Sequence, residues 1–136
     1  MTSSPPCAPD CLGIPVRYDP TLPVICHSRW WGSWSLIVVG PAFMRFHPRE
    51  RTALLLHEAA HCRLLHVKHR LLSLWLLFWC PSALSLLCRR QEFEADEFVA
   101  RLGYGPDLAT ALLRVNSRAS SLHPPKQQRI DRLLRI

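Results

Sequence analysis

The chain has 136 residues, which is enough for one small domain with a hydrophobic core but leaves no room for a second catalytic module. Its formal net charge is +7, but Lys and Arg are spread along the chain, without the basic-aromatic platform or the C-x-x-C finger of many nucleic-acid binders. We therefore do not expect a nucleic-acid partner, whereas a basic surface beside apolar sequence suits an anionic membrane surface.

Residues 1–15 are rich in Pro, Ser and Cys and are predicted to form an irregular leader. The N-terminus has neither the basic start nor the apolar core of a signal peptide, so we expect a cytoplasmic protein. The six cysteines of the chain show no paired spacing and are expected to be free, mostly buried thiols. They are Cys7, Cys11, Cys26, Cys62, Cys80 and Cys88. Cys7 and Cys11 would need two further ligands to bind a metal, so no site is predicted there.

Three short strands are predicted before the first long helix. They cover residues 16–18, 22–26 and 35–39, and Asp19–Pro20 forms a turn between the first two. The third is the best strand in the sequence. We expect these strands to form a short antiparallel sheet. The nearby tryptophans, Trp30, Trp31 and Trp34, are expected to pack against this sheet or to lie at a membrane interface.

The sequence His57-Glu58-Ala59-Ala60-His61 has the pattern H-E-x-x-H and adjoins an apolar run without Pro or Gly, which predicts a helix. Residues four apart share a helix face, so His57 and His61 can present both imidazoles to one metal ion. Glu58 lies one step round the helix, where it can hold a metal-bound water without being a ligand. This is the geometry of a zinc peptidase with Glu58 as the general base. The alternative is two histidines on a helix flank with an accidental Glu.

We expect this helix to begin near Arg49, after His47-Pro48, and to run into residues 64–70. His47 is expected to have a structural or capping role. His66 is nine residues after His57 and lies about a right angle away round the helix, so neither it nor His69 is predicted as a ligand.

The strand before such a helix is where zinc peptidases usually carry the edge that pairs with an extended substrate. That pairing uses backbone hydrogen bonds and would explain broad specificity. We therefore predict that a peptide or protein substrate lies along Leu36, Ile37, Val38 and Val39.

Residues 71–88 are uncharged, which meets the lower length limit for a transmembrane helix. A straight span would carry the chain about 27 Å away from the first helix. A carboxylate must nevertheless return to the metal, and both flanks are basic, which favours their staying on one side. We predict a helical hairpin with its turn within residues 76–81, packed on the sheet or dipping into one leaflet as a peripheral or monotopic contact.

The second helix is predicted from about Ser82 to Leu102. Glu92 and Asp96 are four residues apart and share a face, while Glu94 points roughly the opposite way. A His-His-Glu site needs one carboxylate on the metal and another acceptor to orient a ligand histidine, and this pair can supply both. The alternative is a solvated acidic helix face. A third helix is predicted from Pro106, and a last short helix near residues 129–134 docks on the core.

Together these motifs resemble a known family. The residues H-E-A-A-H, R-R-x-E-F-x-A-D-x-x-A, L-G-Y-x-P and S-x-H-P-P-x-x-x-R-I look like those of the gluzincin peptidases, nearest to the HtpX heat-shock and CAAX prenyl protease family. The hairpin and the following Arg-Arg are also similar to the BlaR and MecR sensor peptidases. The resemblance covers roughly residues 35–135.

The resemblance implies a residue set: zinc ligands His57, His61 and Glu92, general base Glu58, and Asp96 as partner of a ligand histidine. It also implies that His123 or Arg129 stabilises the oxyanion or anchors Asp96. The relatives often carry several transmembrane helices, and the sensor peptidases carry a receptor domain, neither of which is expected here.

The sequence therefore predicts a small α+β, zincin-like domain over residues 16–136. A short sheet would pack on the H-E-x-x-H helix and on a second, Glu-bearing helix, followed by a helical C-terminal part. The predicted function is that of a zinc endopeptidase with one Zn²⁺ per chain. The rival is a non-catalytic, zinc-stabilised, membrane-associated interaction module, against which the intact Glu58 argues.

Overall fold

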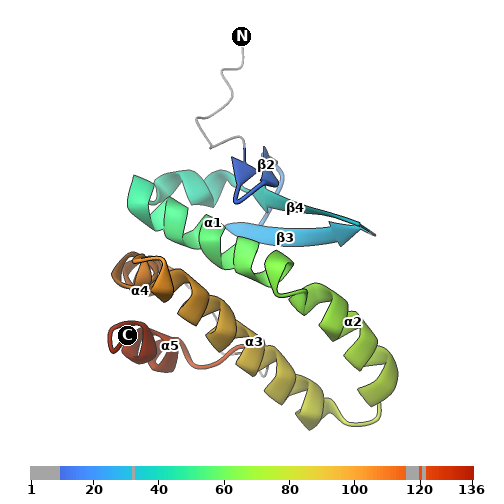
Figure 1. Ribbon diagram of the computed structural model, residues 1–136. Coiled ribbons are helices and arrows are strands. Elements are labelled where there is room, and N and C mark those ends of the chain that lie inside the picture. Colours follow the sequence, from blue (N-terminus) through green and yellow to red (C-terminus); the bar gives the residue numbers. More distant parts are fainter. Residues whose placement is uncertain (1–9, 32, 116–119, 121) are drawn as a thin grey trace.

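The computed structural model describes residues 10–31, 33–115, 120 and 122–136 (Figure 1). These residues form an α+β fold, as predicted. The strands are β1 (Asp10–Cys11), β2 (Ile14–Tyr18), β3 (Cys26–Trp31) and β4 (Trp34–Val39). A 3-10 helix, η1 (Pro41–Arg45), leads into the helices α1 (Pro48–Arg63), α2 (His66–Leu77), α3 (Pro81–Arg101), α4 (Gly105–Arg114) and α5 (Lys126–Leu133).

The sheet is mixed, so the prediction of an antiparallel sheet is wrong for one strand pair. The strand order is β1-β2-β4-β3, with β4 antiparallel to β3 but parallel to β2. The reason is that β4 enters between β2 and β3. The chain between those two strands therefore passes over the end of β4 instead of making a hairpin.

That connection also corrects the strand predicted over residues 22–26, of which only Cys26 is in a strand. Pro23 has no N–H to donate to a ladder. Instead, the connection crosses Gly40, whose N–H donates a hydrogen bond of 2.9 Å to the Ile25 carbonyl. A glycine is needed at this crossing because the backbones approach so closely.

The leader prediction is wrong over residues 10–15, because β1 and the start of β2 pair there and Ile14 is buried in the core. Residues 1–9, including Cys7, lie outside the described residues. Cys26, Cys62, Cys80 and Cys88 are free thiols, and Cys62 and Cys88 are buried.

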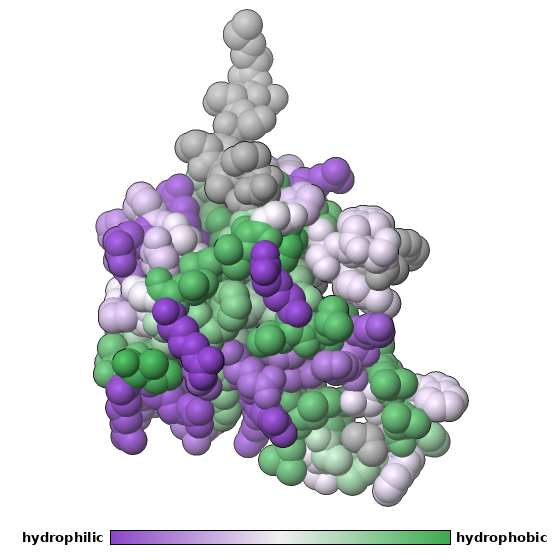
Figure 2. Space-filling view, in the orientation of Figure 1, coloured by the Kyte–Doolittle hydropathy of each residue, from purple (hydrophilic) through white to green (hydrophobic). Residues whose placement is uncertain are grey.

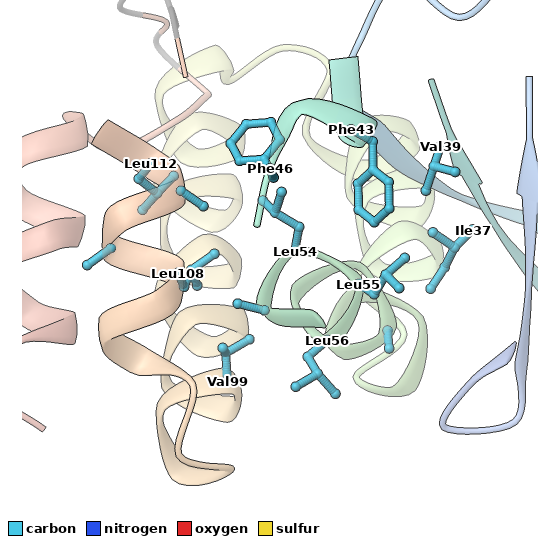
Figure 3. Close-up of a cluster of buried hydrophobic side chains, with 14 of the residues drawn as sticks. Ile37, Val39, Phe43, Phe46, Leu54, Leu55, Leu56, Val99, Leu108 and Leu112 are labelled. Carbon is cyan, nitrogen blue, oxygen red and sulfur yellow. The ribbon is translucent and has the colours of Figure 1, made fainter. Parts of the chain in front are cut away.

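Helix α1 is packed on two sides. The sheet covers one side, and α3 and α4, on which α5 packs, cover the other (Figure 1). Figure 3 shows apolar side chains of α1 (Leu54–Leu56) between two from β4 (Ile37 and Val39) and two from the helical layer (Val99 of α3 and Leu108 of α4). The start of α1 is fixed by Pro48 and by Glu50, whose carboxylate accepts a hydrogen bond from the His47 N–H. His47 is therefore the residue that caps this helix.

The first long helix is interrupted, contrary to the prediction that it continues into residues 64–70. It ends at Arg63, and α2 begins at His66 after a turn at Leu64–Leu65. Leu65 has φ of 56°, in the left-handed region that is unfavourable for a branched side chain. The hairpin turn between α2 and α3 lies at residues 78–80, within the predicted range. No helix among the described residues is both long and apolar enough to cross a membrane.

We predict that Gly40→Ala destabilises the fold. An added Cβ would lie 2.6 Å from the Val24 carbonyl oxygen and 2.9 Å from that of Leu22. Backbone must then move, which should lower the free energy of unfolding by about 1–3 kcal/mol. Urea titration followed by circular dichroism measures this, with Ser33→Ala in the exposed turn before β4 as the control. Equal midpoints for the two variants would contradict the prediction.

Candidate metal centre

Three side chains from α1 and α3 converge on one point. His57 Nε2 and His61 Nε2 lie 3.0 Å apart, and each is 3.3 Å from a different oxygen of Glu92. All three residues are buried, and their ligand atoms lie within 4.8 Å of one another. One turn of α1 spaces the two imidazoles, and the packing of α3 along α1 brings the carboxylate to them. The predicted ligands therefore form a group that could hold a metal ion.

The second nitrogen of His57 faces Asp96. Its Nδ1 lies 3.1 Å from Asp96 Oδ1, a short contact that is bent away from an ideal hydrogen bond. Asp96 in turn accepts two hydrogen bonds, of 2.8 and 2.7 Å, from the guanidinium of Arg129 on α5. Arg129 thus anchors Asp96, one of the two roles that the sequence resemblance left open for it. Burial alone would raise the pKa of Asp96, but its contacts with Arg129 and His57 hold that pKa below its ordinary value.

His61 has a partner that the sequence did not predict. Its Nδ1 lies 2.8 Å from Nδ1 of His66, and His66 Nε2 lies 3.1 Å from a carboxylate oxygen of Glu94. On an unbroken helix His66 would lie about 140° round from His61, at about 100° per residue. The turn at Leu64–Leu65 removes that obstacle. The only indication in the sequence was the presence of His66 and Glu94 beside the two motifs.

These contacts set the proton positions on both ligand histidines. A carboxylate only accepts hydrogen bonds, so Glu94 requires a proton on Nε2 of a neutral His66. Nδ1 of His66 must then accept from Nδ1 of His61, and Asp96 likewise favours a proton on Nδ1 of His57. Both Nε2 atoms are left with lone pairs that face one another at 3.0 Å. A cation or a proton between them relieves this repulsion, so the residues fit a bound metal ion.

Without a metal, a proton takes its place. Burial alone would lower the pKa of His57, but the contacts with Asp96 and Glu92 outweigh it and raise that pKa to about 9. Glu92 is surrounded by donors: Arg70 at 3.0 Å, Arg129 at 3.5 Å, and His123 at 3.8 Å. Burial opposes its ionisation, yet His123, His57 and His61 hold the pKa of Glu92 well below its usual range.

Glu58 is accessible where its neighbours are not. Every residue of α1 from Ala53 to Cys62 is buried except Glu58, which is half-buried. It lies on the wall of a pocket of about 510 Å³ that two of the ligand residues, His57 and Glu92, also line. One part of this wall is apolar (Leu54, Leu108, Leu112 and Val115) and another is basic (Arg89, Lys126 and Arg129). His123 also lies on it, 56% exposed.

The predicted substrate strand is in the wrong place. Leu36, Ile37, Val38 and Val39 belong to β4, which is flanked by β2 on one side and by β3 on the other. Pairing with both neighbours uses the ladder positions that a peptide would need. Within the described part of the sheet the edge strands are β1 and β3, and β3 is the longer of the two. It is also the strand nearest the pocket, whose wall includes Cys26.

Comparison with protein-family models, with curated proteins and with solved structures found no match to this chain.

Zinc binding should release a proton from His57. Because the pKa of His57 is about 9 in the metal-free protein, the imidazole is protonated near neutral pH, and zinc needs the same nitrogen. Proton release should therefore decline as the pH rises through about 9. Calorimetry in two buffers of different ionisation enthalpy counts the protons. Asp96→Asn removes a carboxylate that raises this pKa and should reduce the count near neutral pH, and an unchanged count would contradict the assignment.

We also predict that Glu94→Ala weakens zinc binding about tenfold, because the acceptor that sets the protons of His66 and His61 is removed. Competition with a chromophoric chelator measures the affinity. Glu97→Ala is the matched control, since Glu97 lies on the same helix and pairs with Arg101 away from the site. If both variants bound zinc equally tightly, the role of Glu94 would be disproved.

Proposed function

We propose that this chain is a zinc-dependent endopeptidase in which His57, His61 and Glu92 hold the ion. The observation that carries the proposal is the accessible carboxylate of Glu58 on the wall of a pocket that His57 and Glu92, two of the three buried ligand residues, also line. Two imidazoles and one carboxylate are a donor set of catalytic zinc sites, which keep a fourth position open for water. The resemblance to the gluzincin motifs supports the same assignment.

The residues of the chain divide the chemical work. Zinc, when bound, lowers the pKa of a water molecule and polarises the scissile carbonyl. Glu58 accepts the proton of the attacking water and returns it to the nitrogen of the leaving amine. Asp96 and His66 keep the two ligand imidazoles oriented. His123, on the pocket wall, would donate a hydrogen bond to the carbonyl oxygen as negative charge develops there.

The substrate would bind as an extended peptide along β3. Its outer side is open within the described sheet, and its first residue, Cys26, lies on the pocket wall. Backbone pairing of this kind places a peptide by its main chain rather than by its sequence. The apolar part of the pocket, formed in part by Leu108 and Leu112, would accept an apolar side chain beside the scissile bond. We therefore expect broad specificity with a preference for an apolar residue.

The rival is a non-catalytic module in which zinc only stabilises the fold. Such a module would need the same three ligands, and the buried contacts around them serve either function equally well. The two proposals differ at Glu58, because a structural metal site has no use for an accessible carboxylate beside the ligands.

Glu58→Gln separates the two proposals. It removes the general base without touching a ligand, so zinc should bind one ion per chain while peptide cleavage falls by about 10²–10⁴-fold. Zinc content is measured by elemental analysis, and cleavage is measured with casein and with a quenched-peptide library. Glu97→Gln, on the exposed face of α3, is the control and should cleave at the wild-type rate.

Zinc in both proteins with cleavage only in the wild type and the control would establish the peptidase. Equal cleavage by Glu58→Gln would disprove the role of Glu58. Stoichiometric zinc with no cleavage by any of these proteins would favour the structural module. In that case a substitution of His57 that prevents zinc binding should also unfold the protein.

A further inference from the structure

The free end of the α2–α3 hairpin exposes a large apolar surface. Its aromatic residues are the most exposed large hydrophobic residues in the described part of the chain: Trp75 at 76%, Phe78 at 77% and Trp79 at 70%. Several leucines lie around them, namely Leu71, Leu72, Leu74, Leu76 and Leu86. Figure 2 shows apolar residues gathered at the hairpin end, at the lower right. The three rings alone expose roughly 350–550 Å², which is as much as the largest apolar patch of a typical monomer.

The exposed side chains surround much of the helix rather than forming one stripe. Leu71, Leu72, Leu74, Trp75 and Leu76 cover an arc of about 200° of α2 at about 100° per residue. A helix that docks on another protein buries a narrower face, of about 100°. Exposure over a wider arc and at the adjoining turn suits an environment that is apolar on every side. A lipid layer is such an environment.

The charged residues nearest the hairpin end are basic. From Ala59 to Gln91 the sequence contains no Asp or Glu, whereas five Lys or Arg residues lie in that stretch: Arg63, Lys68, Arg70, Arg89 and Arg90. Lys68 and His69 are exposed at the start of α2. Basic residues flanking an apolar, Trp-bearing segment are complementary to anionic lipid headgroups. Arg70 and Arg90 are paired with Glu92 and Glu94 at the base of the hairpin, and no acidic residue lies nearer its end.

We propose that the hairpin end inserts through the headgroups of an anionic lipid bilayer to the boundary with the acyl chains, with Trp75, Phe78 and Trp79 at this interface. Insertion is shallow because α2 has 12 residues, about 18 Å, against a hydrocarbon core of about 30 Å. Polar groups at the turn are already partly satisfied, since Trp79 Nε1 donates to the Leu76 carbonyl at 2.9 Å. The proposal does not depend on peptidase activity.

The metal centre would then sit close to the bilayer. Arg70, at the base of the hairpin, donates hydrogen bonds to Gln91 and to Glu92, so α2 is joined directly to a ligand residue. Seven residues separate Arg70 from the end of α2 at Leu77, a rise of about 10 Å. With the hairpin end inserted, Glu92 would therefore lie on the order of 10 Å from the inserted tip.

Vesicle co-sedimentation of the full chain tests the proposal. Wild-type protein should bind vesicles of phosphatidylcholine with added phosphatidylglycerol, bind less to phosphatidylcholine alone, and dissociate as salt is raised. Replacing Trp75, Phe78 and Trp79 by Ser should lower the partition coefficient at least about tenfold. The matched control replaces Trp34 and Leu134 by Ser, since both are exposed and lie outside the hairpin; its binding should remain at the wild-type level.

A second measurement does not require loss of binding. Brominated phosphatidylcholine in the anionic vesicles should quench the tryptophan fluorescence of the wild type, and the variant with Trp75→Phe and Trp79→Phe should still bind but lose most of this quenching. Glu58→Gln and the metal-free protein should bind vesicles as the wild type does. Vesicle binding is thus tested separately from peptide cleavage, and a wild type that does not bind vesicles would leave the peptidase proposal standing.

Three results would overturn the proposal. The first is wild-type protein that stays in the supernatant with anionic vesicles. The second is a Ser control that loses binding as fully as the hairpin variant. The third is a wild-type oligomer in analytical ultracentrifugation that the hairpin substitutions dissociate, which would assign the surface to a second copy of this chain.

Discussion

The fold depends on one buried charge cluster between α1 and α3. Two carboxylates, Glu92 and Asp96, are removed from water there, which is tolerable only if each is paired. The partners come from different helices: the histidines from α1, Arg70 from α2 and Arg129 from α5. The cluster therefore ties four helices together. Removing one partner would leave a buried charge without compensation, so the residues that would bind a metal also hold the helices in place.

The apolar core explains why this cluster is rigid. Leu54–Leu56 of α1, which directly precede His57, are packed between the sheet and the other helices (Figure 3). Because α1 is covered on both sides, its histidines have little freedom to move, which preorganises the ligand geometry. Glu58 is the exception in this part of the helix, and its half-buried position faces the pocket. Between Ala53 and Cys62, Glu58 is therefore the residue whose side chain a substrate in the pocket could reach.

Sequence patterns predicted the parts of this arrangement that depend on local spacing. The four-residue spacings of His57 with His61 and of Glu92 with Asp96 follow from helix periodicity, and the return of α3 was required by the need to bring Glu92 back. The strand order could not be predicted, because the parallel pairing of β2 with β4 is set by a crossing at Gly40 that has no local pattern. The same error placed the substrate on an interior strand. His66 was missed because helical periodicity was extended across a turn that the sequence does not mark.

That turn links the two functions proposed for the chain. Leu65 adopts a left-handed conformation that costs a branched residue about 1–2 kcal/mol, and no glycine is present to avoid it. The contacts made immediately after it offset that cost: His66 meets His61, and Arg70 meets Glu92. Helix α2 begins directly after this turn and carries the exposed aromatic end away from the core. Strain at a single residue thus completes the surroundings of the ligand histidines, at the start of the helix that carries the apolar hairpin end.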